Sequence, residues 1–103
     1  MKNIPLNERI IFALDFTDPE EAKRWVEKVD SEIKFFKVGL TLFLAGWWPI
    51  IDHIVKRGNK VMVDLKFFDI PETVHFATQH LKNRGVTFAT VHGNDPIIEA
   101  AVK

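Results

Sequence analysis

The feature that most constrains this chain is a regular alternation of strand-like and helix-like segments, repeated about every 25 residues. Strand patterns cover residues 9–15, 33–38, 60–65 and 86–91. The connections are short, and such alternation is typical of parallel strands joined by right-handed helical crossovers. The chain is therefore predicted to form four β/α units within one domain, residues 1–103.

The ends of the helix-like segments support this division. Asp18 followed by Pro19 predicts an N-cap and a first helical residue. The second helical segment is predicted to restart at Pro49 and to end at Gly58 in a left-handed turn. An Asp-Pro pair at residues 95–96 repeats the first signal and predicts a fourth helix.

Two architectures bury such a parallel sheet: a doubly wound open sheet and a (β/α)8 barrel. A doubly wound nucleotide-binding domain usually carries a Gly-x-Gly-x-x-Gly turn after its first strand, whereas residues 16–19 here are Phe-Thr-Asp-Pro. A complete barrel usually needs about 250 residues. We therefore predict an α/β fold that is a parallel (β/α)4 half of a TIM (β/α)8 barrel, completed by self-association.

Composition excludes several classes of protein. The chain has 14 basic and 14 acidic residues, and it has no cysteine. A net charge of zero argues against a nucleic-acid polymer as a partner and against a polybasic membrane patch. No apolar run approaches the roughly 20 residues of a membrane span, and the absence of cysteine excludes disulfides and thiolate metal sites. A soluble, cytoplasmic protein is expected.

Charged residues end three of the predicted strands. Asp15 closes the first strand, Lys37 closes the second, and Asp64 and Lys66 lie two apart at the end of the third. Because α/β folds place their active sites at the carboxyl ends of strands, these four side chains could form a ring of alternating charge. The alternative for any one of them is a charge that simply meets solvent. Four together on apolar strands favour a functional site, since buried unpaired charges are costly.

The ring suggests a particular kind of chemistry. A lysine flanked by carboxylates stays protonated, because neighbouring anions favour its charged form. It is then a general acid beside a negative patch, which suits loss of a carboxylate and protonation of the resulting carbanion. No organic cofactor is suggested. The four histidines show no convincing metal-ligand spacing, and no metal is predicted; they are His53, His75, His80 and His92.

Four sequence motifs together resemble the orotidine 5′-monophosphate decarboxylase family in order and spacing. They are Phe-Ala-Leu-Asp at 12–15, Phe-Lys-Val-Gly at 36–39, Asp-Leu-Lys-Phe-Phe-Asp-Ile-Pro-Glu-Thr-Val at 64–74 and Val-His at 91–92. A bare Asp-x-Lys would be weak support, but Asp-x-Lys-x-x-Asp-Ile-Pro-x-Thr is specific. The Ile-Pro-Glu-Thr extension also points away from sugar-phosphate relatives that use a metal.

The resemblance implies a lyase of pyrimidine biosynthesis that converts orotidylate to uridylate and CO2. Lys66 would donate the proton to C6 of the pyrimidine, and Asp64 would lie against the substrate carboxylate. Lys37 would belong to the same network. Asp69 would reach the active site of a partner subunit, because the family's sites are completed across a homodimer.

The resemblance also implies substrate-binding positions. Asp15 would hold ribose hydroxyls with Lys37, Ile70 and Thr73 would accompany Asp69 into the partner's site, and His92 would contact the substrate. The family's phosphate and pyrimidine contacts lie largely in the second half of the barrel, which this sequence does not contain. An isolated monomer is therefore expected to be inactive.

Several aromatic residues depart from the family pattern. Trp47 and Trp48 stand where small residues are expected, and Phe76 falls opposite the apolar face of its predicted helix, with His80 beside it. Natural variation would account for them. The other interpretation is a homo-oligomeric interface, since interfaces favour tryptophan and phenylalanine. The competing function is accordingly a truncated or engineered self-assembling half-barrel scaffold without catalytic activity.

Overall fold

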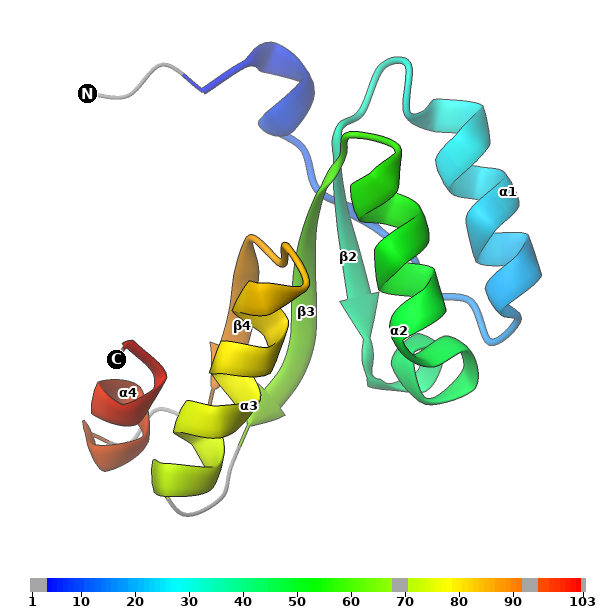
Figure 1. The fold of residues 1–103 in the computed structure, drawn as a ribbon. Coiled ribbons are helices and arrows are strands. Elements are labelled where there is room, and N and C mark those ends of the chain that lie inside the picture. Colours follow the sequence, from blue (N-terminus) through cyan, green and yellow to red (C-terminus); the bar gives the residue numbers. More distant parts are fainter. Residues whose placement is uncertain (1–3, 68–70, 92–94, 103) are drawn as a thin grey trace.

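Four parallel strands in the order β1-β2-β3-β4 form one sheet in the computed structural model, which describes residues 4–67, 71–91 and 95–102 (Figure 1). The sequence prediction of four β/α units is confirmed. The elements in chain order are η1 (Leu6–Glu8), β1 (Phe12–Ala13), α1 (Pro19–Val29), β2 (Phe35–Gly39), α2 (Leu40–Lys56), β3 (Lys60–Phe67), α3 (Pro71–Asn83), β4 (Phe88–Val91) and α4 (Asp95–Val102).

Alternate residues of the strands point to opposite faces of the sheet. Phe36 and Val38 of β2, with Val61 and Val63 of β3, are fully buried in the core that α1 and α2 complete. The residues between them belong to the other face, because successive strand side chains alternate. Lys37 of β2 lies on that second face. This alternation separates an apolar helix-covered side from a side that carries charge.

Helix α1 begins as the sequence predicts. The Asp18 carboxylate accepts a hydrogen bond from the Glu20 backbone N–H at 3.0 Å, and Pro19 occupies the first turn. Such a cap satisfies an amide that has no partner within the helix. Ala22 and Val26, on one stripe of the helix, are fully buried against the sheet and α2.

Helix α2 contains the predicted interruption. The backbone at Trp47 is non-helical, with φ 49° and ψ −149°, and the helix resumes through Pro49. Proline has no backbone N–H to bond to the preceding turn, so a helix tends to begin at it rather than run through it. The turn after α2 uses Gly58 at φ 81°, as predicted.

The first strand is shorter than expected. The sequence pattern predicted a strand over residues 9–15 covered on both faces, but β1 spans Phe12–Ala13 and Ile10 is 64% exposed. The reason is topological: β1 lies at the edge of the sheet and pairs with β2 alone. The other strands lie within two residues of their predicted bounds. Across the described ranges, no helix is both long and apolar enough to cross a bilayer.

Candidate active site at the carboxyl ends of the strands

A hollow of about 410 Å³ opens where β1, β2 and β3 end and α2 begins. It lies at the carboxyl edge of the sheet, because the parallel strands all end on the same side. Asp15, Lys37 and Asp64 all line it, together with the hydroxyl-bearing Thr17 and Thr41. The structure thus gathers three of the four residues predicted to form a charged ring.

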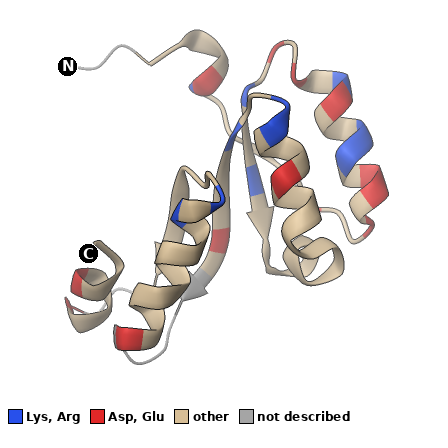
Figure 2. Ribbon diagram, in the orientation of Figure 1, with Lys and Arg blue, Asp and Glu red and all other residues tan. Residues whose placement is uncertain are grey.

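An ion pair joins the second and third strands across this hollow. The Lys37 ammonium lies 3.8 Å from Oδ2 of Asp64, and their side chains are 29% and 16% exposed. Figure 2 shows the basic segment of β2 beside the acidic segment of β3. The pair is long for an ion pair, and both residues line the hollow.

A residue of β4 completes this contact, and sequence analysis did not identify it. The Thr90 hydroxyl donates a hydrogen bond to Oδ1 of Asp64 at 2.7 Å. Both Asp64 oxygens are therefore held, one by Lys37 and one by Thr90. A possible signal was the strand-end position of Thr90, but a threonine in a strand is too common to indicate a site.

The backbone of β3 is irregular at the same place. Val63 pairs with Ala89 and Phe67 pairs with Val91. Between these two pairs β3 advances by four residues and β4 by only two. Extra residues of this kind bend a strand and redirect its side chains, and they often occur beside active sites. Lys66 falls inside this irregular stretch, two residues after Asp64.

Other predicted site residues lie outside the described part of the chain. Asp69, Ile70 and His92 belong to the segments that are not described, and the Lys66 side chain is likewise outside the description. Thr73 is described: it is exposed in the first turn of α3, which follows the carboxyl end of β3. Their predicted roles stay predictions.

The four residues predicted for an interface separate into two kinds. Trp48 packs within the chain: its ring stacks on His80 of α3, with centroids 6.3 Å apart, and meets Phe43 edge-on. Trp47 and Phe76 are 57% and 59% exposed. Trp48 and His80 thus join α2 to α3, whereas Trp47 and Phe76 remain available at the surface.

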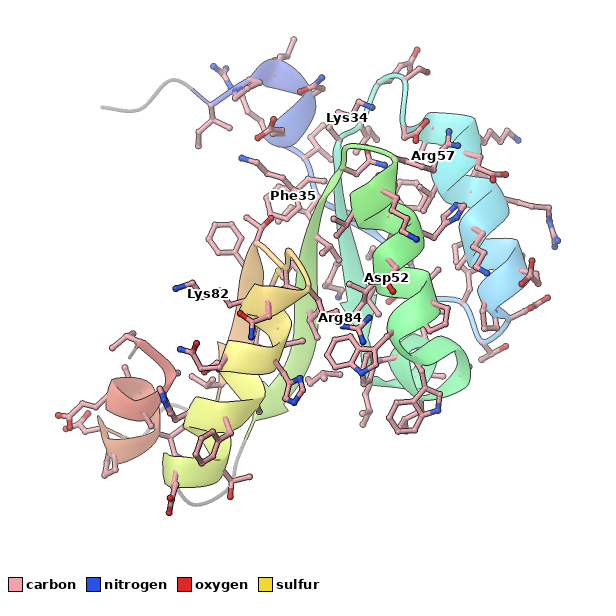
Figure 3. All side chains as sticks on the ribbon, in the orientation of Figure 1. Lys34, Phe35, Asp52, Arg57, Lys82 and Arg84 are labelled. Carbon is pink, nitrogen blue, oxygen red and sulfur yellow. The ribbon has the colours of Figure 1, made fainter. Side chains whose placement is uncertain are left out.

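A second charged cluster ties the amino end of the sheet. The Asp30 carboxylate, after α1, accepts two hydrogen bonds from Arg57 at 2.7 and 3.1 Å and one from Asn59 at 3.3 Å. Hydrogen bonding from Arg57 lowers the pKa of Asp30 below its ordinary value, although burial opposes this shift. In turn, the hydrogen bond to Asp30 raises the pKa of Arg57. Figure 3 labels Arg57 at this end.

The residues that the structure describes include no group of three or more His, Asp or Glu side chains placed to hold a metal ion. The described residues that line the hollow include an ammonium, two carboxylates and threonine hydroxyls.

Fold and site together define a class of protein: half of a parallel α/β barrel with a charged site at the carboxyl ends of its strands. The sequence profile of the Orotidine 5′-phosphate decarboxylase / HUMPS family matches residues 8–103. The chain belongs to this family.

Named relatives agree with this assignment. Orotidine 5′-phosphate decarboxylase of Methylococcus capsulatus is 52% identical over 103 residues, covering 99% of this chain and 43% of that protein. The Stenotrophomonas maltophilia enzyme is 38% identical over 96 residues, covering 92% of this chain and 40% of that protein.

Solved structures show the same fold. The crystal structure of orotidine 5′-phosphate decarboxylase from Lactobacillus acidophilus matches with a TM-score of 0.81 at 34% identity. The match covers 91% of this chain and 43% of that one. The chain therefore spans less than half the length of these relatives, as predicted for the N-terminal half of the barrel.

Proposed function

We propose that this chain supplies the N-terminal half of an active site that decarboxylates orotidine 5′-monophosphate to uridylate, a lyase step of pyrimidine biosynthesis. The observation that carries the proposal is the Lys37–Asp64–Thr90 contact at the carboxyl end of the sheet, in a chain of this family. Lys66 follows Asp64 by two residues in β3. The expected cytoplasmic location stays a prediction.

In this proposal the reaction needs no group beyond the side chains themselves. The bond between C6 and the carboxylate breaks, CO2 leaves, and the electron pair remains on C6. The Lys66 ammonium then gives its proton to C6 and recovers one from water. Asp64, held by Lys37 and Thr90, would lie against the departing carboxylate. Charges fixed in place before the reaction stabilise its transition state without reorganising.

The remaining predicted residues would bind the substrate. Asp15, two residues after β1, lines the hollow. In this proposal it would accept hydrogen bonds from the ribose hydroxyls. His92 would contact the substrate from the end of β4. Asp69, Ile70 and Thr73 would reach the site of a partner subunit.

Turnover also depends on binding energy from parts of the substrate that do not react. The phosphate and pyrimidine contacts are expected from the second half of a family barrel, and this chain covers 43% of its Methylococcus relative. We therefore expect little or no turnover from the 103-residue chain by itself.

A chimera tests the proposal directly. Residues 1–103 replace the matching segment of the Methylococcus capsulatus relative, and loss of CO2 from orotidine 5′-monophosphate is measured. We expect turnover that falls about a thousandfold or more in Lys66→Ala, because it loses its general acid. The control is Lys56→Ala, an exposed lysine at the end of α2, which should leave turnover unchanged.

Three results would count against the proposal. An inactive but folded chimera would remove the catalytic assignment and favour the scaffold function, which the exposed Trp47 and Phe76 support. Equal activity in the chimera and its Lys66→Ala variant would exclude Lys66 as the proton donor. Turnover that requires an added divalent cation would indicate the metal-using branch of the family.

A further inference from the structure

The sheet face that carries the charged residues also carries a pair of stacked aromatic rings. Phe35 of β2 and Phe88 of β4 have ring centroids 5.7 Å apart and ring planes inclined at 13° (Figure 3 labels Phe35). Their strands are not neighbours, because β3 lies between them. Adjacent strands are about 4.8 Å apart, so the backbones of β2 and β4 are separated by roughly 10 Å. The two rings therefore reach toward each other across β3.

Each ring comes two residues before a residue of the candidate site. Lys37 follows Phe35 on β2, and Thr90 follows Phe88 on β4. Residues two apart on a strand project from the same face, so each ring shares a face with its site residue. Lys37 and Thr90 both contact Asp64 of β3, at 3.8 and 2.7 Å. The polar contacts thus join β2 and β4 across β3 a second time, directly beyond the aromatic contact.

The ladder between β3 and β4 changes register at the level of the candidate site. Met62 pairs with Phe88, and the register shifts between Val63 and Phe67. Thr90 is a β4 residue within the shifted stretch, whereas Phe88 belongs to the regular part just before it. An irregular ladder fixes the spacing of two strands less strictly than a regular one. Side-chain contacts in the last regular part therefore help to set the position of the strand beyond it.

The two rings differ in how firmly the chain holds them. Phe35 is only 5% exposed, whereas Phe88 is 56% exposed. The contact with Phe35 is thus a fixed support for the Phe88 ring. Close-packed side chains transmit a displacement to their neighbours, and an error of about 1 Å in a catalytic group can lower activity about a hundredfold. A leucine in place of either ring is too short to maintain the contact across β3.

We propose that Phe35 and Phe88 are positioning residues for the proposed decarboxylation. Their stack sets the spacing of β2 and β4 on either side of β3, and it thereby holds Lys37 and Thr90 against Asp64. This inference rests on the proposed function, in which Asp64 would lie against the departing carboxylate. The rings act through these polar contacts and take no part in the bond changes themselves.

The first test is kinetic and uses the chimera with the Methylococcus relative. Phe35→Leu and Phe88→Leu should each lower kcat about tenfold or more, with a smaller change in KM, because Asp64 loses its fixed position in the transition state. The matched control is Phe36→Leu, the next residue of β2, which is fully buried on the opposite face. It should lower the melting temperature at least as much as Phe35→Leu does and should keep kcat.

The double variant tests whether the two rings act through one contact. Removal of either ring already breaks the stack, so Phe35→Leu combined with Phe88→Leu should lose no more kcat than the more impaired single variant. Losses that multiply in the double variant would show that the rings act separately and would overturn the proposal.

A crystal structure of each leucine variant of the chimera gives a test that needs no turnover. The distance from the Thr90 hydroxyl to Oδ1 of Asp64, 2.7 Å here, should exceed about 3.5 Å, beyond hydrogen-bonding range. Phe35→Leu gives the answer if Phe88→Leu does not fold.

The two tests separate this inference from the proposed function. A wild-type chimera without turnover would contradict the proposed function, and the Thr90–Asp64 distance would still show whether the stack positions these residues. A contact that stays at 2.7 Å in the leucine variants would overturn the inference. An equal loss of kcat in Phe36→Leu and Phe35→Leu would overturn it as well, because packing alone would then explain both.

Discussion

The two ends of the sheet use charged residues in opposite ways. At the carboxyl end, Lys37 and Asp64 lie 3.8 Å apart beside an open hollow. At the amino end, Arg57 binds Asp30 with two short hydrogen bonds, and Asp30 is only 7% exposed. The first pair is long and borders the hollow, whereas the second is short and largely buried within the chain.

This difference separates function from stability. A carboxylate that Arg57 and Asn59 already satisfy has little capacity left for a substrate, and it links the end of α1 to the turn before β3. A pair as long as Lys37–Asp64 contributes little to folding, and both of its residues border the hollow. In α/β barrels generally, the carboxyl end holds the site and the amino end contributes stability. Substitutions at the two ends should therefore affect different properties.

The largest expected effect is at the carboxyl end. In the chimera with the Methylococcus relative, Asp64→Ala should lower kcat/KM on the order of a thousandfold, because under the proposed function it removes the charge that would lie against the substrate carboxylate. Its melting temperature should change little. The control Asp52→Ala breaks the exposed Arg84–Asp52 pair at 3.0 Å (Figure 3) and should keep activity. Equal losses of kcat/KM in Asp64→Ala and Asp52→Ala would contradict a specific role of the carboxyl end in function.

At the amino end, Asp30→Ala should lower the free energy of unfolding by about 2 kcal/mol, because Arg57 and Asn59 lose a largely buried partner. The measurement is urea unfolding of the 103-residue chain at fixed concentration. Activity per folded molecule of the chimera should stay unchanged. If Asp30→Ala lowers the activity per folded molecule but leaves the free energy of unfolding unchanged, the assignment of the amino end to stability is wrong.

The pH dependence of the free energy of unfolding gives a second test of the Asp30 contribution. Because Arg57 lowers the pKa of Asp30 below its ordinary 3.8, the folded state favours the ionised carboxylate. This stability is complete above 3.8 and is lost as pH falls through the lower pKa of the folded state. The stability difference between wild type and Asp30→Asn should therefore be constant from about pH 7 to 5 and shrink below pH 3.8. A difference that grows on acidification would exclude this origin.

A smaller effect is expected from the hydroxyl that holds Asp64. Thr90→Val removes the 2.7 Å hydrogen bond and should lower kcat/KM of the chimera about tenfold, as expected for one charge-assisted hydrogen bond. Thr90→Ser keeps the hydroxyl and should restore most of the activity. If the serine variant is as impaired as the valine variant, the methyl group rather than the hydrogen bond is responsible.

The smallest effect concerns backbone strain near the carboxyl end. Trp47 has φ 49°, a conformation that glycine adopts without penalty. Trp47→Gly should be about 1 kcal/mol more stable to urea than Trp47→Ala, because both lose the ring contact with Phe43 and only glycine relieves the strain. Equal stability of the two variants would show that the backbone relaxes when the ring is removed.

Much of the fold was predictable because its signals are local. The Asp18–Pro19 helix start, the break before Pro49 and the left-handed turn at Gly58 each follow from the covalent geometry of one or two residues. The length of β1 was not predictable. An apolar run in the sequence does not show whether its strand lies at the centre of a sheet or at its edge, and β1 lies at the edge.

The sequence by itself determined the order of four β/α units and the strand ends at which Asp15, Lys37 and Asp64 stand. Only the tertiary structure decided which contacts those residues make. The Thr90–Asp64 hydrogen bond and the Asp30–Arg57 clamp join positions 26 and 27 residues apart. Periodicity and capping report on neighbours within a turn or a strand, whereas such contacts depend on how whole elements pack.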